Sequence, residues 1–305
     1  MLEVKNLEKS YNDFRVLKEI NFRIERGEIF GFLGRNGAGK TTTINILTGL
    51  IGYDHGQVLV NGEELGQQKK WLQKSMGYLP ENPVFYDYMT GKEYLQFTGK
   101  INNYEQKELE KRCDELLEQV KLKEACNRRI GGYSRGMKQR LALAVALFNR
   151  PEILFLDEPT SALDPEGRRE MIDLIKRSGE MNTTVFLSTH ILSDIEKVCT
   201  KVSILNEGRI VLSKNIRDLK EEYILPIYDI IFEQKPDHFS ELENKNWVDK
   251  VKIKGNEMSV YLKTIEKGKT ELLRYLGEKD AAVESFQIRK NTLEDIFIRV
   301  VNNDE

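Results

Sequence analysis

The sequence predicts a two-domain α/β protein, with a parallel, doubly wound sheet over residues 1–220 and a small α+β domain over residues 221–305. Two observations predict the first domain. Short apolar strands alternate with helical segments, which is typical of parallel sheets, and 305 residues suffice to bury two cores. From about residue 223 the alternation stops, and a hairpin with a mixture of short strands and helices predicts the second domain.

The first 65 residues predict strands joined by turns. The N-terminus and residues 16–24 mostly alternate apolar and polar side chains, and residues 58–60 end at an Asn-Gly turn. A short buried strand over residues 28–33 runs into a glycine-rich loop, after which residues 41–50 are expected to be helical. This segment is therefore expected to consist of strands and turns, with a buried strand that leads into the glycine-rich loop.

A helical region is expected over about residues 82–150. Thr90 and Glu93 form a capping box for a helix that continues to Phe97. Apolar residues between 109 and 120 fall on one face of a second helix. The apolar run 141–148 is far shorter than the roughly 20 residues of a membrane span and predicts a buried helix.

Strand and helix then alternate again, which completes the predicted parallel sheet. The expected strands are residues 153–156, 184–187 and 202–205, the last of the domain, and the expected helices are residues 165–178 and about 192–199. A charged connector over residues 217–222 leads to the second domain. Its expected elements are strands 228–232 and 283–288, a hairpin of 251–254 with 258–261, and helices 267–276 and 292–301.

Composition narrows the class of protein. The 47 Lys and Arg against 49 Asp and Glu give a net charge of −2, which argues against a dedicated nucleic-acid binder and predicts no nucleic-acid partner. The three cysteines are odd in number and never spaced C-x-x-C, which favours reduced thiols. Because the N-terminus lacks the apolar core of a secretory signal, we expect the chain to be cytoplasmic.

A phosphate-binding loop follows the strand at residues 28–33. The segment from Gly34 to Thr41 satisfies G-x-x-x-x-G-K-[ST], in which glycines let backbone N–H groups and a helix N-terminus face phosphate oxygens. Lys40 is expected to reach the β- and γ-phosphates and the Thr41 hydroxyl to ligate Mg²⁺. The predicted nucleotide-binding residues of the loop are Gly34, Arg35, Asn36, Gly37, Ala38, Gly39, Lys40, Thr41 and Thr42.

Two acids end the apolar strand at residues 153–156. Strand ends of a parallel sheet meet at one edge, so Asp157 and Glu158 are expected beside the glycine loop. Asp157 would hold Mg²⁺, and Glu158 would polarise a water against the γ-phosphate. If the two acids are considered without the rest of the sequence, the alternative is an acidic end of a strand before Pro159 that has no catalytic role. The phosphate-binding loop favours the roles in Mg²⁺ binding and catalysis.

The segment 133–140 narrows the family. Together with the phosphate loop and the two acids, it resembles the ATP-binding cassette (ABC) ATPases, whose signature is L-S-G-G-Q. Ser134 and Gly136 match the signature, whereas Tyr133, Arg135 and Met137 depart from it in a way similar to multidrug and antibiotic exporters. An ordinary helix N-cap is the alternative for Ser134 alone.

The resemblance covers roughly residues 1–220 and implies a P-loop NTPase fold: a RecA-like parallel-sheet core, an N-terminal antiparallel β subdomain and a helical signature subdomain. It implies a switch histidine at His190, a D-loop at Asp164 and an adenine-stacking Tyr11. Glu81 stands where most relatives carry a metal-shell Gln. Packing or capping roles remain the alternatives for these residues, and a solvated loop acid for Glu81.

The resemblance also implies partners. Two copies would form a head-to-tail dimer around two ATP molecules with Mg²⁺, and Ser134, Arg135, Gly136 and Met137 would act in trans. The aromatic-rich stretch 82–89 is expected to line a groove that receives a cytoplasmic helix of a separate membrane permease, with packing of the helical segment on itself as the alternative. The permease would hold the chain at the cytoplasmic face of the membrane, and the resemblance makes an exporter the favoured function. A soluble ABC ATPase that acts on ribosomes or DNA is the alternative.

Overall fold

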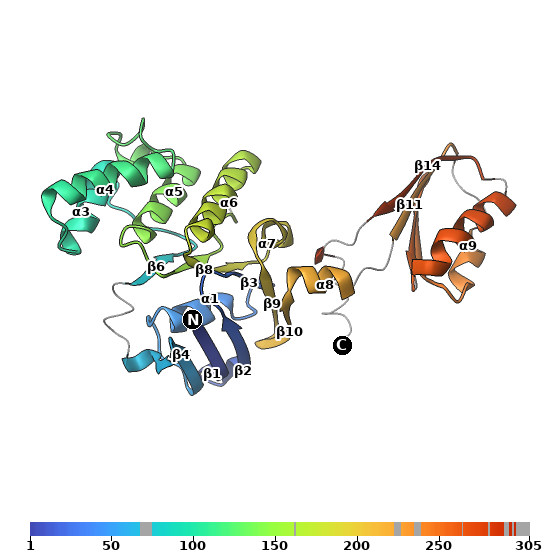
Figure 1. The fold of residues 1–305 in the computed structure, drawn as a ribbon, viewed down its shortest axis with the longest axis horizontal. Coiled ribbons are helices and arrows are strands. Elements are labelled where there is room, and N and C mark those ends of the chain that lie inside the picture. The colour runs from blue at the N-terminus through green and yellow to red at the C-terminus, as the bar shows by residue number, and fades with distance from the viewer. Residues whose placement is uncertain are drawn as a thin grey trace. The chain divides into compact units, whose positions relative to one another are not determined.

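The structure is a computed structural model that describes residues 1–67, 75–161, 163–222, 227–234, 239–263, 265–279, 281–289, 293, 294 and 296. The chain divides into two compact units, Met1–Ile216 and Arg217–Glu305 (Figure 1). Each unit has its own buried core.

The first unit contains an antiparallel sheet with the strand order β2-β1-β4-β5. Its strands are β1 (Leu2–Tyr11), β2 (Phe14–Ile24), β4 (His55–Val60) and β5 (Glu63–Glu64). Leu2 pairs with Ile24 on one side and with Val60 on the other, so the N-terminal strand lies in the interior of this sheet. Short 3-10 turns, η1 (Leu65–Gln67) and η2 (Ile130–Gly132), occur elsewhere in the unit.

A six-stranded sheet forms the centre of the first unit, with the order β10-β9-β3-β8-β7-β6. The strands are β3 (Ile29–Gly34), β6 (Met76–Leu79), β7 (Ile153–Asp157), β8 (Thr184–Thr189), β9 (Lys201–Asn206) and β10 (Arg209–Asn215). Every residue of β3, β7 and β8 is buried, because helices or the other sheet cover both faces of a parallel sheet. This explains why these strands are apolar runs rather than alternating sequences.

Both edge strands of this sheet differ from the sequence prediction. β10 follows β9 in an antiparallel hairpin, so residues 202–205 are not the last strand, as expected. β6 pairs in parallel with β7, although the sequence predicts no strand there. Edge strands bury fewer side chains than central strands, and β10 is mostly exposed or half-buried.

An aromatic core joins the two sheets. Phe22 of β2 stacks on Phe30 and contacts Phe32 of β3, with ring centroids 5.5 Å apart in both pairs. Phe186 of β8 lies among these rings and also contacts Phe155 of β7 at 5.7 Å. The strands that lead to the phosphate loop and to the two acids therefore pack through one continuous cluster.

Helices cover the sheet as its alternating sequence predicts. Helices α1 (Lys40–Leu47), α6 (Pro165–Glu180) and α7 (Leu192–Val198) pack on its strands, and α5 (Arg135–Ala146) packs on β6. Helices α3 (Gly91–Ile101) and α4 (Gln106–Gln119) pack with each other and with α5 (Figure 1). The capping box of Thr90 and Glu93 is confirmed at the start of α3. The predicted connector after residue 216 is helical instead, as α8 (Ile216–Glu222).

In its described residues, the second unit has a four-stranded antiparallel sheet whose core includes residues of α9. Its elements are β11 (Ile227–Phe232), the 3-10 turn η3 (Ser240–Asn244), β12 (Val248–Lys254), β13 (Glu257–Leu262), α9 (Ile265–Glu278) and β14 (Val283–Arg289). The strand order β12-β13-β11-β14 matches a ferredoxin-like arrangement with a 3-10 turn in place of the first helix. The predicted hairpin is confirmed, with Gly255 at a φ of +63°. The predicted helix 292–301 falls mostly outside the described residues.

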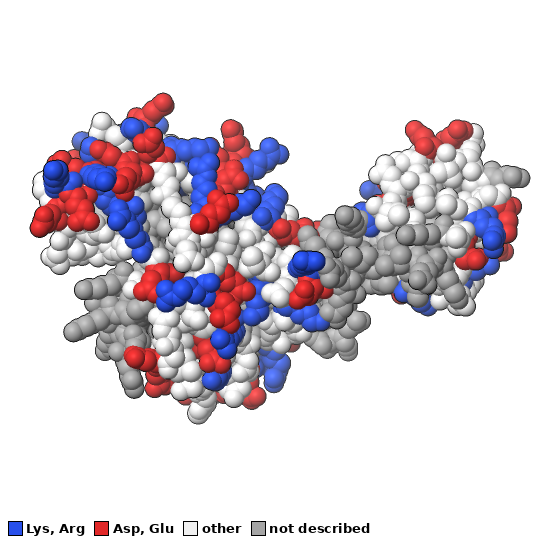
Figure 2. Space-filling model, in the orientation of Figure 1, with Lys and Arg blue, Asp and Glu red and all other residues white. Residues whose placement is uncertain are grey.

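Two surface properties concern partners. Over the part of the chain that the structure describes, no helix is both long and apolar enough to cross a membrane. Figure 2 shows basic and acidic side chains interspersed on the visible face of the first unit. This mixture agrees with the nearly balanced charge of the sequence.

Candidate active site

The glycine-rich loop joins β3 to α1 at the carboxyl edge of the six-stranded sheet. Gly37 and Gly39 adopt φ values of +82° and +113°, which residues with a Cβ rarely adopt. A Cβ at Gly39 would lie 2.6 Å from Leu17 Cδ2, so the loop backbone also packs too closely for any side chain there. The glycines are therefore required by the loop, which leaves backbone groups on its concave side free of side chains.

Lys40 begins α1 and turns back over this loop. Only 6% of the residue is exposed, and Nζ donates hydrogen bonds to Gly34 O at 2.9 Å and Arg35 O at 3.3 Å. Burial of an ammonium group is unfavourable unless it is paired. The carbonyl groups hold the Lys40 charge in place, and an acid described below completes the pairing.

Asp157 is the last residue of β7 and is 1% exposed. Its Oδ1 accepts a hydrogen bond of 2.5 Å from the Ser188 hydroxyl of the adjacent strand. Burial raises the pKa of the Asp157 carboxyl above its usual range, while hydrogen bonds from Ser188 and Thr41 lower it in part. The first residues of α1 thus meet the end of β7 through the Thr41 hydroxyl.

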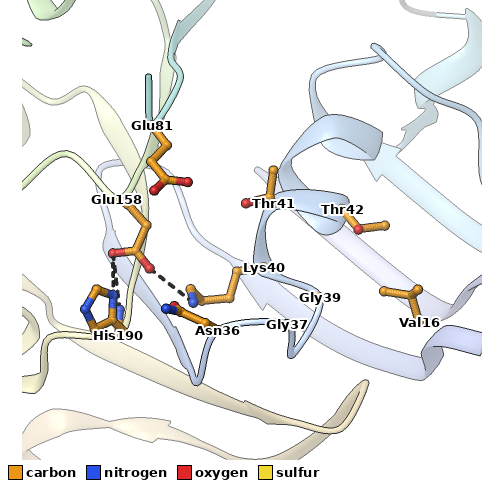
Figure 3. A pocket seen from close by; sticks show the side chains of 10 residues that line it. All are labelled: Val16, Asn36, Gly37, Gly39, Lys40, Thr41, Thr42, Glu81, Glu158 and His190. Atoms are coloured by element: carbon orange, nitrogen blue, oxygen red, sulfur yellow. Dashed lines mark hydrogen bonds and ion pairs between the residues drawn. The ribbon is translucent and has the colours of Figure 1, made fainter. Parts of the chain in front are cut away.

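Glu158 links three parts of the site (Figure 3). Its Oε2 lies 2.9 Å from His190 Nδ1 and 3.4 Å from His190 N, and its Oε1 lies 3.1 Å from Lys40 Nζ. Oε1 is buried and forms no hydrogen bond of good geometry, despite this ion pair. A buried acceptor without a hydrogen bond is unusual and is available to another donor.

The backbone at Glu158 is strained. Its φ of +45° lies in the left-handed region, which costs a residue with a side chain roughly 1–2 kcal/mol. The peptide is held by a hydrogen bond of 3.0 Å from Glu158 N to Ser188 O. Strain of this kind persists where surrounding contacts fix the backbone, and it occurs often at functional sites.

These groups surround a cavity of about 390 Å³. The lining residues are Val16, Asn36, Gly37, Gly39, Lys40, Thr41, Thr42, Glu81, Glu158 and His190 (Figure 3). Arg35 and Ala38 lie on the other side of the loop, where they line a neighbouring cavity of about 480 Å³. The structure thus brings residues from five separate segments to one edge of the sheet.

Tyr11 is not among the residues that line this cavity. It ends β1, is 47% exposed, and has Lys9 Nζ at 5.6 Å from its ring centroid. Val16 lines the cavity instead, and Ser188 holds Asp157, although the sequence singled out neither. A polar residue at the end of an apolar strand is a usable signal for Ser188, whereas nothing in the sequence marks Val16.

The donor set fits a triphosphate with Mg²⁺. The glycine cradle, the buried Lys40 ammonium group and the helix N-terminus suit phosphate oxygens. Thr41 and Asp157 supply a hydroxyl and a carboxylate oxygen, the ligands that Mg²⁺ prefers. Among the described residues no group of three or more His, Cys, Asp or Glu could hold a metal ion.

The signature segment lies at a different cavity of about 500 Å³. Ser134, Arg135, Gly136 and Asp164 line it, and none of its lining residues lines the cavity at the glycine loop. Ser134 Oγ accepts a hydrogen bond from Met137 N at 3.3 Å, and Asp164 Oδ1 accepts one from Gly167 N at 3.2 Å. Both residues therefore serve as helix N-caps within the single chain.

An aromatic surface lies before and along α3. We define it as Phe85, Tyr86, Tyr88, Tyr94 and Phe97, whose rings contact one another at centroid distances of 4.9–6.2 Å. Tyr88 is 70% exposed and Tyr86 50%. Backbone hydrogen bonds from residues 130 and 131 to residues 89 and 87 connect this surface to the segment just before the signature.

Comparisons with known proteins agree with this geometry. Residues 17–161 match the family model described as ABC transporter, and residues 215–301 match the C-terminal domain of DrrA1-3-like ATP-binding proteins. The chain is 38% identical to the ABC transporter ATP-binding protein YxlF of Bacillus subtilis, over 99% of this chain and all of YxlF. It is 42% identical to the bacitracin transport ATP-binding protein BcrA of Bacillus licheniformis, over 69% of this chain and 68% of BcrA.

A solved structure has the same fold. The dimeric, post-hydrolysis state of the ATP-binding cassette MJ0796, bound to ADP and phosphate, is 26% identical with a TM-score of 0.65 and covers 71% of this chain and 99% of that chain. The predicted ABC cassette fold is confirmed. The chain therefore belongs to the ATP-binding proteins of ABC transporters, a family of ATPases.

Proposed function

We propose that this ATPase powers a separate membrane permease, and that its hydrolytic centre is the constellation of Lys40, Glu158 and His190. The observation that carries the proposal is the position of the Glu158 carboxylate, held by His190 on one oxygen and paired with the Lys40 ammonium group on the other. Phosphate oxygens engaged by Lys40 would release Oε1 of Glu158. That oxygen then accepts a hydrogen bond from the attacking water.

Thr41 and Asp157, with Glu81 beside them, would hold Mg²⁺, whose positive charge would offset negative charge on the phosphates. Thr41 already donates to Asp157, and Glu81 lines the same cavity. Glu81 replaces the neutral Gln of most relatives with a charged ligand. The sequence-based roles of the glycine loop and of Tyr11 as an adenine contact are part of this proposal.

The proposed working form is a head-to-tail dimer. Ser134, Gly136 and Asp164 share a cavity separate from the glycine loop of their own chain, which suits completion of the site by a second copy. The exposed N-terminus of α5 would offer backbone donors to the γ-phosphate of the partner's nucleotide. The MJ0796 relative is a dimer with ADP and phosphate, which supports this arrangement.

The proposed direction is export, at the cytoplasmic face of a membrane. Support comes from two relatives, named for bacitracin transport and linearmycin resistance, which are 42% and 35% identical to this chain. The aromatic surface is the proposed contact for the permease. Exposed aromatic rings that pack mainly on one another are typical of protein–protein contacts.

The catalytic proposal is tested with Glu158→Gln. We expect this variant to bind ATP, to hydrolyse it about 10²- to 10³-fold more slowly, and to accumulate as a dimer in gel filtration. Glu152→Gln is the matched control, because Glu152 immediately precedes β7 at its other end and pairs with Arg26 there. Normal turnover by Glu158→Gln would place the base elsewhere.

The permease contact is tested with Tyr88→Glu. The exchange is expected to leave the ATPase activity of the isolated chain unchanged and to abolish co-purification with the membrane-spanning partner. Met181→Glu, at a side chain that is 62% exposed beyond the end of α6, is the control. Intact co-purification and transport in Tyr88→Glu would remove the aromatic surface from the proposal.

A further inference from the structure

A buried carboxylate lies behind the catalytic edge and belongs to none of the motifs discussed above. Asp194, in the first turn of α7, is 1% exposed. Its Oδ2 accepts a hydrogen bond of 2.5 Å from the Thr160 hydroxyl, and its Oδ1 accepts one of 2.7 Å from Arg168 Nε. Arg168 also donates to Ser193 Oγ at 3.1 Å.

These contacts connect three segments of the site. Thr160 follows Glu158 by two residues, and Asp194 follows His190 by four residues. Arg168 lies in the first turns of α6, the helix that begins directly after Asp164. Within the described residues of the loop between β7 and α6, Glu158 also bonds to Ser188 and His190, and two short-range hydrogen bonds run from Ser161 N to Glu158 O and from Leu163 N to Thr160 O, both at 3.2 Å. Asp194 therefore connects this loop by a hydrogen bond to α7, the helix that begins two residues after His190.

The energetics of burial argue against a mere packing role. A buried carboxylate loses its hydration, and an apolar residue of similar size is often at least as stabilising. Asp194 instead accepts two directional hydrogen bonds, and one of them comes from the charged Arg168. The other comes from Thr160, which lies on the same loop as Glu158 with its left-handed φ. Hydrogen bonds of this kind specify a geometry that apolar packing alone leaves less defined.

We propose that Asp194 is a positioning residue that holds the loop after β7 through Thr160, and thereby keeps the Glu158 carboxylate against His190. The inference rests on the proposed role of Glu158. Nucleotide binding depends on the glycine loop and Lys40, whereas the hydrogen bonds of Asp194 go to Thr160 and Arg168. Loss of the Asp194–Thr160 hydrogen bond therefore lowers kcat without weakening the binding of ATP.

Thr160→Val removes the hydrogen bond from Thr160 to Asp194 with little change in side-chain shape. We expect kcat to fall about tenfold, with KM for ATP no more than about twofold above wild type, and Thr160→Ser to restore kcat because it restores the donor. Asp194→Asn keeps the shape and removes the charge, and the same direction of change is expected. Thr184→Val is the matched control, since this fully buried threonine accepts a hydrogen bond from Gly27 N at the opposite end of β8.

A second measurement is independent of hydrolysis. The sequence has three histidines, so the ¹⁵N imidazole signals of His190 can be assigned by substitution and report its contact with Glu158. These signals are expected to shift in Thr160→Val and to keep their wild-type positions in Thr184→Val and Thr160→Ser.

Wild-type kcat and unshifted His190 signals in Thr160→Val would overturn the proposal, as would a Thr160→Ser variant as slow as Thr160→Val. Normal turnover by Glu158→Gln would refute the proposed base instead. The His190 signals would still decide whether Asp194 positions the Glu158 carboxylate.

Discussion

Neutralising Glu158 is expected to tighten the binding of ATP. The Glu158 and Lys40 side chains are each 6% exposed, and Oε1 lies 3.1 Å from Nζ. At an effective dielectric constant of about 20, two unit charges at that distance attract by about 5 kcal/mol. ATP must compete with this attraction for the same ammonium group, and its phosphates also meet the charge of Glu158.

Glu158→Gln removes both obstacles. In this variant Lys40 still donates hydrogen bonds to the carbonyl groups of Gly34 and Arg35. The buried ammonium group therefore loses only part of its stabilisation when no nucleotide is bound. A gain of about 1.4 kcal/mol in binding corresponds to a tenfold lower Kd. We therefore expect Kd for ATP to fall at least tenfold, and the melting temperature without nucleotide to fall as well.

The assay is isothermal titration calorimetry with ATP in the presence of a chelator, so that hydrolysis does not interfere. Glu152→Gln is the control, because its partner Arg26 is exposed and distant from the glycine loop. An unchanged or weaker affinity in Glu158→Gln would refute the reasoning. It would mean that the Lys40–Glu158 pair does not oppose ATP.

Three further outcomes are expected. Gly91→Ala would overlap the Tyr133 hydroxyl and cost about 1–3 kcal/mol in urea unfolding, whereas the double variant with Tyr133→Phe should lose about 1–2 kcal/mol less than the sum of the two single variants; additive losses would contradict the contact. A backbone hydrogen bond from Thr90 lowers the pKa of the Glu93 carboxyl, so its stabilising effect is present above its ordinary pKa of about 4.3 and is lost as pH falls through the lowered value. Glu93→Gln should therefore melt below wild type at pH 7, and the gap should close in melting curves below about pH 4; a constant gap would exclude the charge as its cause. Gly39→Ala, at a φ of +113°, should weaken ATP binding at least tenfold in the same titration, and wild-type affinity would show that the loop tolerates a Cβ.

Motifs that are contiguous in the sequence were predictable. The glycine loop, the acids after β7 and the capping box at Thr90 each depend on neighbouring residues, because the local backbone alone brings their groups together. The central strands were predictable as well, since strands buried on both faces are short apolar runs. The family resemblance added the expected fold, which the comparisons confirm.

Contacts between distant segments were decided by the tertiary structure. The edge strands β6 and β10 were not predicted, and their pairing with β7 and β9 defines them as strands. Ser188 reaches Asp157 because β8 lies beside β7, and Asp194 reaches Thr160 across 34 positions of the sequence. The sequence by itself determined which chemical groups stand at each strand end. Strand order and helix packing decided which of them meet, because a hydrogen bond needs an approach within about 3 Å that only the assembled sheet provides.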